Sequence, residues 1–413
     1  MILDFPVNNE IREFINNYDL FLMPNGIYKA KTVRADNYLY PMYFYKDGDT
    51  FVVSTSVYAL INYKGRFIRN PKFQTTTYAR ATYLTIDKEI NRVRTTPRRS
   101  SLEIIDKDVI VDLGVKLIQK YITEIETLYP DRVHIVLMGG KDSQNIVLAK
   151  RKSKWIVFSS YPNAPLNEKY ILDNKIEIER FVSVSNDTEN SLLKQEIMAS
   201  DLYYNITHFR WTKALKDLVS EYNGKAILWL GTDGDGIFKK NANHREKDYY
   251  ARHELGVGMS MGIQHQVIKN ILNIPVISPY QSPAFLDELF FKFDPYFVRK
   301  HLETRHEIGE KFLGRPVIYP EENPEPEMWD RNRTIALPSY INQLKNEGIS
   351  CHTDPLRSYI IKSKEEFFSI ISKYSEKRVT KTQKFFYNIR DSLSKVIPQF
   401  RIKHYRTDEK EIK

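Results

Sequence analysis

The sequence contains a single cysteine, Cys351, among its 413 residues. One thiol per chain excludes a disulfide framework within the chain and a zinc site built from four thiolates. It also excludes enzymes that need paired cysteines to carry sulfur or to hold an iron–sulfur cluster. A chain that uses so little cysteine is suited to a reducing compartment, and we therefore predict a cytoplasmic protein.

Long apolar runs are absent as well. No stretch approaches the ~18–20 apolar residues that a membrane span needs, and the N-terminus has no basic region followed by an apolar core. We therefore expect a soluble, unexported protein. Hydrophobic residues make up 42% of the chain. At about 100–200 residues per domain, this length favours two or three domains.

Several familiar site signatures are missing. The sequence has neither the G-x-x-x-x-G-K-[ST] phosphate loop nor a G-x-G-x-x-G fingerprint that opens a helix after a strand. Its nine histidines do not form H-E-x-x-H, so a zinc site lacks support and we expect core or surface histidines. No G-x-S-x-G elbow offers a serine nucleophile.

What the sequence does contain is a glycine turn after an apolar run, in residues 135–143, Ile-Val-Leu-Met-Gly-Gly-Lys-Asp-Ser. Gly139 and Gly140 let backbone N–H groups approach an anion, and a helix expected to begin near Ser143 points its positive end at the same place. Lys141 adds positive charge, and Asp142 has the chemistry of a magnesium ligand. The pattern indicates phosphate binding, although a purely structural strand-to-helix turn is the alternative.

A second apolar run also ends in glycines and acids. Residues 226–238 read Ala-Ile-Leu-Trp-Leu-Gly-Thr-Asp-Gly-Asp-Gly-Ile-Phe. Because the carboxyl ends of parallel strands meet at one edge of a sheet, Leu137, Phe158 and Leu230 are expected to converge on one crevice. The alternative for Asp233 and Asp235 is an acidic turn that caps a helix.

Both segments resemble motifs of one enzyme family. Residues 138–143 resemble the S-G-G-x-D-S motif of the PP-loop ATP pyrophosphatases, except that Met138 stands where the family has Ser. Residues 230–238 resemble the S-G-x-G-A-D-E-L-F element of its asparagine synthetase branch, with Gly236 in place of Glu. Residues 277–289 resemble the R-x-P-F-L-D segment, and residues 40–61 resemble the end of the family's N-terminal domain. These matches span roughly residues 38–290 and follow the family's order.

The resemblance implies ATP and Mg²⁺ as cofactors, with Asp142 and Asp235 facing one Mg²⁺ from two strands. It also implies that Lys141 stabilises the departing pyrophosphate, that Lys311 (or Lys300) adds a further cation, and that Glu254 helps the amine to lose its proton. Ordinary surface and helix-face roles remain the alternative for these last residues. The residues implied in nucleotide binding are Leu137, Met138, Gly139, Gly140, Lys141, Asp142, Ser143, Phe158, Leu230 and Gly231, with Phe158 near the adenine.

The N-terminus selects among branches of the family. Glutamine-dependent members hydrolyse glutamine with an N-terminal Cys, whereas this chain begins Met1-Ile2-Leu3-Asp4 and has no early Cys, Ser or Thr. The resemblance is therefore to β-lactam synthetase and the lasso-peptide cyclases, which activate a carboxylate for attack by an amine. It implies an ATP-dependent amide-forming ligase whose acyl donor, amine and oligomeric state the sequence leaves open.

The expected fold class is α/β, with a doubly wound parallel sheet of the adenine-nucleotide α-hydrolase-like kind. We expect a β-rich, degenerate glutaminase-like domain over residues 1–100, in which 92–99 is a linker, and an ATP-binding domain over 111–315. Apolar positions spaced by three and four from Val111 predict a helix that leads into the phosphate-binding strand, and Trp155–Phe158 predicts the next strand. Residues 316–413 are expected to be a lid or linker followed by a basic, helical C-terminal region.

Two other functional classes stay open. The net charge of +10, with 62 Lys and Arg against 52 Asp and Glu, would suit a PP-loop enzyme that modifies nucleic acid such as tRNA. A basic face is also an ordinary solvated surface. Finally, Met138 and Gly236 are compatible with a catalytically degenerate nucleotide fold that serves as a binding subunit.

Overall fold

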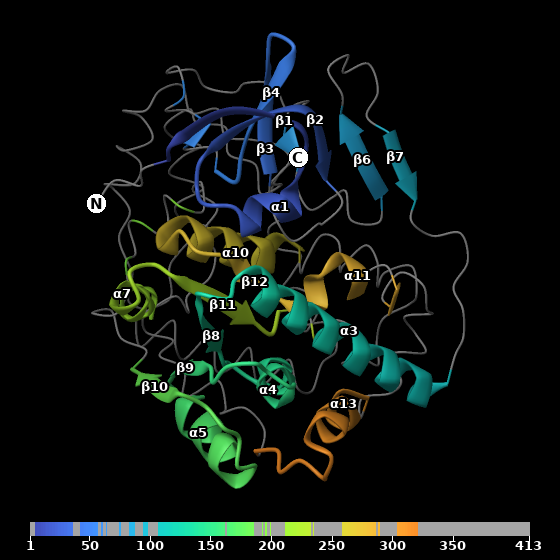
Figure 1. Cartoon of the computed structure of the whole chain (residues 1–413), viewed down its shortest axis with the longest axis vertical. Coiled ribbons are helices and arrows are strands. Elements are labelled where there is room, and N and C mark those ends of the chain that lie inside the picture. Colours follow the sequence, from blue (N-terminus) through green and yellow to red (C-terminus); the bar gives the residue numbers. More distant parts are fainter. Residues whose placement is uncertain are drawn as a thin grey trace, which may run out of the picture.

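The computed structural model describes residues 5–35, 42–56, 59–60, 63, 74–75, 82–86, 94–97, 106–161, 163–185, 192, 195, 199, 211–232, 234, 258–285, 288–289 and 304–320. Two sheets organise this part of the chain (Figure 1). The first is formed by residues 7–97 and is mostly antiparallel, and the second is formed by residues 133–277 and is parallel throughout. The expected α/β class, with a parallel sheet beside a β-rich N-terminal part, is confirmed at this level.

The N-terminal sheet has the order β5-β3-β4-β2-β6-β7, with β1 paired parallel to β2. Its buried centre consists of Ile15, Leu20, Tyr28, Ala30, Val33, Phe51 and Val53. The strands and the one helix of this part are β1 (Val7–Asn16), α1 (Asn17–Leu22), β2 (Ile27–Ala35), β3 (Met42–Asp47), β4 (Thr50–Ser54), β5 (Gln74–Thr75), β6 (Thr82–Ile86) and β7 (Arg94–Pro97).

One prediction about this region is wrong. Residues 94–97 form strand β7, paired antiparallel with β6, and are not part of a linker. Thr95 and Thr96 are β-branched and fit a sheet ladder, and Pro97 is tolerated because it ends an edge strand. Strands β3 and β4 form a hairpin, and Gly48 in its turn has a positive φ of 64°.

The parallel sheet has the order β10-β9-β8-β11-β12. Starting at β8, the chain adds β9 and β10 on one side and then returns to add β11 and β12 on the other. The strand order therefore reverses between β8 and β11. In such sheets ligands bind beyond the carboxyl ends of the strands at the point of reversal. The elements are β8 (Val133–Leu137), α4 (Lys141–Leu148), β9 (Ile156–Ser160), α5 (Ala164–Asp173), β10 (Arg180–Val184), α7 (Thr212–Glu221), β11 (Ala226–Leu230), α10 (Gly258–Leu272) and β12 (Val276–Ile277).

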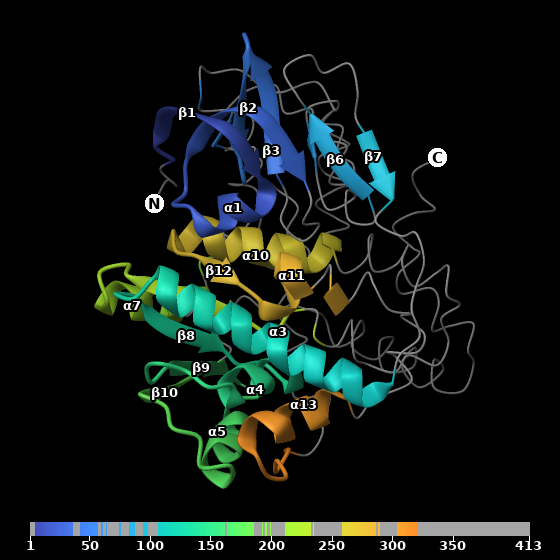
Figure 2. The same ribbon diagram turned by 45° about the vertical axis from the view of Figure 1, so that its right-hand side comes forward.

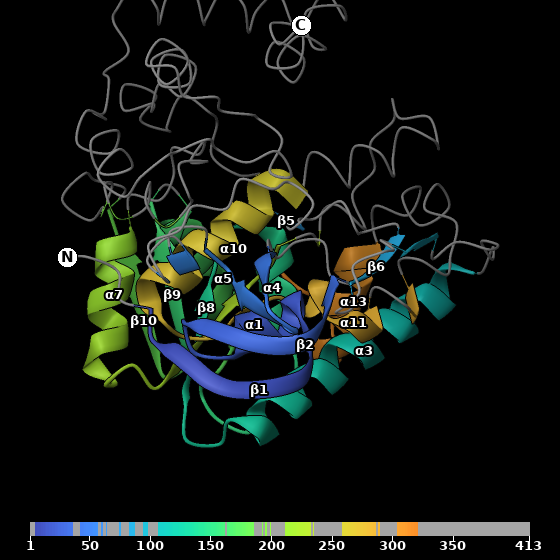
Figure 3. The same ribbon diagram turned by 90° about the horizontal axis from the view of Figure 1, so that it is seen from above.

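Helices cover both faces of the parallel sheet. Alternate strand residues such as Val136, Val157 and Trp229 join one core cluster with the helices α3 (Lys107–Leu128), α4, α5 and α13 (Thr304–Leu313). Figure 2 shows α3, α4 and α13 on this side of the sheet, and α10 next to β12, between the parallel sheet and the N-terminal sheet. Figures 1 and 3 both place α7 and α13 at opposite sides of the sheet. The predicted helix before β8 is confirmed as α3.

The N-terminal sheet is joined to the rest by α1 and by polar contacts with α10. Both helices lie between the two sheets in Figure 2. Tyr18 and Phe21 of α1 belong to the same core cluster as the side chains of the parallel sheet. Asn25 Nδ2 donates to the carbonyl oxygens of Lys269 (3.1 Å) and Asn270 (3.0 Å) at the end of α10. These contacts join segments that lie more than two hundred positions apart in the chain, so the first sheet supports the helix that packs on the second.

Candidate functional site

The turn after β8 forms the centre of the site. Isoleucine and valine favour an extended strand in the run Val133–Leu137, and Gly139 and Gly140 then allow a sharp change of direction. Helix α4 begins at Lys141, earlier than the predicted start near Ser143. Ser143 is buried, and its hydroxyl donates to the Gly140 carbonyl at 2.8 Å. The N-terminal N–H groups of α4 therefore face the carboxyl edge of the sheet, where they favour an anion.

Gly139 is exposed, and a Cβ added to it would meet no atom of the described structure within 4 Å. Packing within the protein therefore does not require glycine at this position. The open face of the Gly139 backbone suits the close approach of a phosphate, which a side chain would obstruct.

Met138 has its side chain in the core, fully buried. Its carbonyl oxygen accepts two hydrogen bonds, from Ser159 Oγ and from Asn167 Nδ2, both at 2.7 Å. Asn167 Nδ2 also donates to Ser159 Oγ at 2.9 Å. These side chains come from β9 and α5 and fix the backbone just before the two glycines. Asn167 was not predicted as a site residue, because nothing in its local sequence distinguishes it from other helix residues.

The segment after β11 packs directly against this turn. A Cβ on Gly231 would lie 2.4 Å from the Ser143 backbone nitrogen, and a Cβ on Gly234 would lie 2.8 Å from the Asp142 Cβ. Since real Cβ atoms do not approach so closely, both positions require glycine. The described parts of the two sequence motifs therefore pack directly against each other. Asp233, Asp235 and Gly236 lie outside the described residues.

Two side chains, one just after β12 and one from α10, hold this second segment in place. Ser278 Oγ, just after β12, donates to the Thr232 carbonyl at 2.9 Å. His265 of α10 contacts the Thr232 hydroxyl through Nε2 at 2.9 Å. Burial lowers the pKa of His265 to about 3, so the imidazole is neutral at physiological pH. The sequence predicted that the histidines are core or surface residues, and His265 lies in the core.

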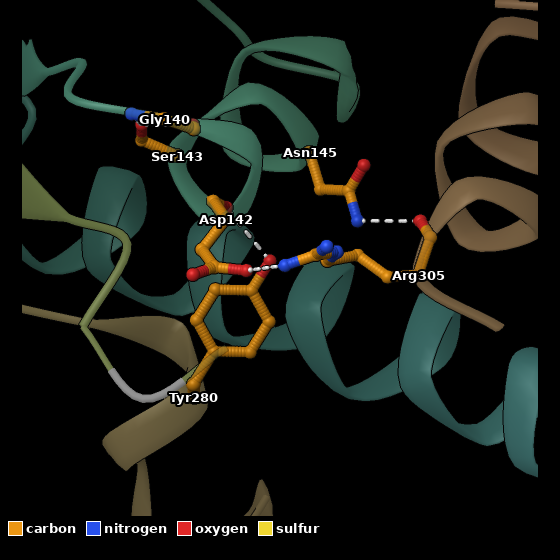
Figure 4. A network of polar contacts seen from close by, with 6 residues as sticks. All are labelled: Gly140, Asp142, Ser143, Asn145, Tyr280 and Arg305. Atoms are coloured by element: carbon orange, nitrogen blue, oxygen red, sulfur yellow. Dashed lines mark hydrogen bonds and ion pairs between the residues drawn. The ribbon is translucent and has the colours of Figure 1, made fainter. Parts of the chain in front are cut away.

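Asp142 lies in a polar network that joins α4 to α13 (Figure 4). Arg305 Nη1 and Asp142 Oδ1 form an ion pair at 2.6 Å, with the two side chains 8% and 20% exposed. Tyr280 Oη donates to the Asp142 backbone oxygen at 2.9 Å. Asn145 Nδ2 donates to the Arg305 backbone oxygen at 2.8 Å. Burial, followed by the charge of Asp142, raises the pKa of Tyr280, so its phenol stays protonated and acts as a donor.

Arg305 is the cation that the sequence analysis did not find. It lies 163 positions from Asp142 in the chain, and no local pattern distinguishes it from other arginines. Lys311, the cation implied by the resemblance, lies on the same helix α13 but forms an exposed ion pair with Asp112 of α3. Six helical residues correspond to about 9 Å along the axis and to a different face, so Arg305 and not Lys311 reaches Asp142 in this arrangement.

The apolar residues predicted near the nucleotide lie side by side. Leu137 pairs with Phe158 in β9 and with Leu230 in β11, which places all three at the carboxyl edge of the sheet. Phe158 is fully buried, and its ring meets that of Trp211 edge-on at 6.2 Å between centroids. The backbone of Lys141 begins α4, whereas its side chain is outside the described part of the structure. Glu254 and Lys300 also lie outside the described residues.

Within the described part of the chain there is no group of three or more His, Cys, Asp or Glu side chains that would hold a metal by itself. In the same part, no helix is long and apolar enough to cross a bilayer. No model of a known protein family and no curated protein matches the sequence. The functional argument therefore rests on the motifs and on the geometry that brings them together.

Proposed function

We propose that the chain is an ATP-dependent carbon–nitrogen ligase of the asparagine synthetase-like PP-loop type. The observation that carries the proposal is the contact between the two motifs, in which Gly231 and Gly234 pack against the first residues of α4. Two glycine-rich turns that follow neighbouring parallel strands and touch at the switch point are the arrangement expected of a nucleotide site. The adenine-nucleotide α-hydrolase-like fold and the cytoplasmic location are parts of the same proposal.

The residues of the turn fit a triphosphate. The α4 N-terminus offers backbone donors, Gly139 leaves the approach open, and Arg305 adds a buried guanidinium beside Asp142. The carboxyl edge beyond Leu137 and Leu230 would hold the rest of the nucleotide. This donor set suits phosphate oxygens and offers little to an uncharged ligand.

Mg²⁺ would be held by Asp142 together with Asp235. When bound there, it would neutralise charge on the phosphates and favour departure of pyrophosphate. The backbone of Asp142 is fixed at the start of α4 by the bond that its carbonyl oxygen accepts from Tyr280 Oη. An oxygen-rich site of this kind suits a hard cation such as magnesium.

The reaction we propose has two transfers. A carboxylate oxygen of the substrate attacks the α-phosphorus of ATP, the bond from that phosphorus to the bridging oxygen breaks, and pyrophosphate leaves. An amine then attacks the acyl carbon, AMP leaves, and the amine nitrogen loses a proton to a base, for which Glu254 is the candidate. The backbone N–H groups of the turn and Lys141 would stabilise charge on the departing pyrophosphate more strongly in the transition state than in bound ATP.

The test measures MgATP binding and carboxylate-dependent exchange of pyrophosphate into ATP, over a panel of carboxylates. Wild type is compared with Asp142→Asn and Asp235→Asn. Asp173→Asn is the control, because Asp173 forms a partly exposed ion pair with Lys169 within α5. We expect both site variants to lose magnesium-dependent binding and exchange, and the control to keep them.

Two other outcomes would point elsewhere. Nucleotide binding without exchange on any carboxylate would favour a degenerate binding subunit, and exchange that requires tRNA would favour nucleic-acid modification. If wild type binds no nucleotide, the ligase proposal is wrong.

A further inference from the structure

Arg305 is held at the site through its backbone as well as its side chain. Asn145 Nδ2 donates to its carbonyl oxygen, and a Cβ on Gly309, one turn further along α13, would lie 2.8 Å from Asn145 Oδ1. Tyr319 Oη donates to the His306 carbonyl at 3.1 Å. Helix α13 thus packs closely on α4, and the position of the guanidinium is set by the helix that carries it (Figure 4).

The guanidinium is only partly satisfied where it lies. Nη1 pairs with Asp142 Oδ1, whereas the buried Nε has no hydrogen-bond partner among the described residues. Burying an unpaired donor of a charged group destabilises that conformation. A conformation in which this donor gains an acceptor is therefore favoured as soon as an acceptor is available.

Asp142 is also the carboxylate that a divalent cation would need. Arg305 and a metal ion are both positive, and both would be attracted to the same carboxylate. Two cations at one carboxylate repel each other, so each weakens the binding of the other unless an additional anion binds at the site. A triphosphate supplies that anion, and the planar fork of a guanidinium matches phosphate oxygens better than a lysine ammonium does.

We propose that Arg305 is the counterion of Asp142 when nucleotide is absent, and that it then competes with the divalent metal for this carboxylate. When metal and nucleotide bind together, Arg305 binds the phosphate chain instead. In this arrangement the carboxylate keeps a counterion at every stage. Metal alone binds weakly, and metal with nucleotide binds well. Because Arg305 belongs to α13, occupancy of the site is also coupled to the position of that helix. The inference rests on the proposed nucleotide site and adds to it a residue and a preference for the metal–nucleotide complex.

The test compares wild type with Arg305→Met and Arg305→Lys, and measures Mn²⁺ binding without nucleotide and MgATP binding separately. Arg180→Met is the control, because Arg180 also pairs with a carboxylate, that of Glu221 at 2.8 Å, but in an exposed position. That pair lies at the amino end of β10, away from the carboxyl edge. Arg305→Lys keeps the positive charge but lacks the planar guanidinium. It provides the test if Arg305→Met fails to fold.

For Arg305→Met we expect Mn²⁺ alone to bind about tenfold more tightly and MgATP about tenfold or more weakly, within the usual range of coupling between two sites. Arg305→Lys should keep the weak Mn²⁺ binding and still lose MgATP affinity. The control should match wild type in both assays. Hydrogen exchange of residues 304–313 should change when MgATP binds to wild type and should not change with Mn²⁺ alone.

Unchanged or weaker Mn²⁺ binding in Arg305→Met, or unchanged MgATP affinity in both Arg305 variants, would overturn this inference while the nucleotide site stands. If neither wild type nor Arg180→Met binds MgATP, the proposed function fails, and the role of Arg305 fails with it.

Discussion

Gly231 lies so close to Ser143 that a Cβ added to it would stand 2.4 Å from the serine's backbone nitrogen. The atoms opposite are backbone atoms of helix α4, which cannot rotate away as the end of a flexible side chain would. Glycine at position 231 therefore allows the two glycine-rich turns to pack closely at the start of the helix.

Gly231→Ala should therefore displace the turn after β11 from the start of α4. We expect a loss of about 1–3 kcal/mol in the free energy of unfolding, as for other overpacked sites, together with loss of MgATP binding. Urea unfolding and calorimetric titration would measure the two effects. A variant with wild-type stability would show that the segments are further apart than described.

Gly139→Ala separates the two roles of glycine. The added methyl group meets nothing within 4 Å, so the free energy of unfolding should change by no more than about 0.5 kcal/mol. MgATP affinity should nevertheless fall at least tenfold, since the methyl group would occupy the face by which phosphate reaches the backbone. Equal affinity in this variant and wild type would argue against phosphate binding at Gly139.

Stability should fall in mild acid because two buried histidines stay neutral in the folded state. Burial lowers the pKa of His134 from 6.5 to about 4 and that of His265 from 6.5 to about 3. Below pH 6.5 the unfolded chain binds protons that the folded chain does not, so the free energy of unfolding falls as the pH falls. Each histidine contributes up to about 1.4 kcal/mol per pH unit.

The measurement is urea unfolding between pH 6.5 and 5, above the range in which most carboxylates titrate. His134→Gln can still accept the 2.9 Å bond from Trp229 Nε1. It should reduce the slope of the free energy of unfolding against pH by the contribution of one titrating group. An unchanged slope would show that His134 is protonated in the folded protein.

Lys269 should give a pH dependence of the same sign, but in the alkaline range. Burial, reinforced by the charge of Arg132, lowers its pKa from 10.5 to about 7, and its amine donates to the Met23 carbonyl. Between pH 7 and 10.5 the unfolded chain holds a proton at this lysine that the folded chain has released. The free energy of unfolding should therefore rise with pH from about 7, by up to about 1.4 kcal/mol per unit. Lys269→Met should remove this rise, and a persistent rise would assign it to another group.

Asn25 should be important for joining the N-terminal sheet to α10. Asn25→Ala removes its two bonds to the Lys269 and Asn270 carbonyls and should lower the free energy of unfolding by about 1–3 kcal/mol, because buried acceptors lose their donor. Asn8→Ala is the control, since Asn8 accepts a single exposed bond from the Glu10 N–H and should change stability little. Equal effects in thermal or urea unfolding would contradict a specific role for Asn25.

The sequence by itself determined the elements whose signals are local. Apolar spacing of three and four predicted α3, and the β-branched and apolar runs predicted β8, β9 and β11. Glycines after two of these runs indicated where the chain turns, because glycine marks such turns within a few residues. Strand β7 was missed because four residues that contain an arginine and a proline carry a weak strand signal.

Tertiary structure alone decided which side chains complete the site. Arg305 reaches Asp142 only because α13 packs on α3 and α4, and Asn167 reaches the Met138 carbonyl only because α5 packs beneath β9. Nothing local in the sequence distinguishes Lys269 from other lysines, yet it is fully buried and its amine donates to the Met23 carbonyl. Such contacts depend on how distant helices pack, and a sequence pattern that repeats every few residues carries no record of a partner 163 positions away.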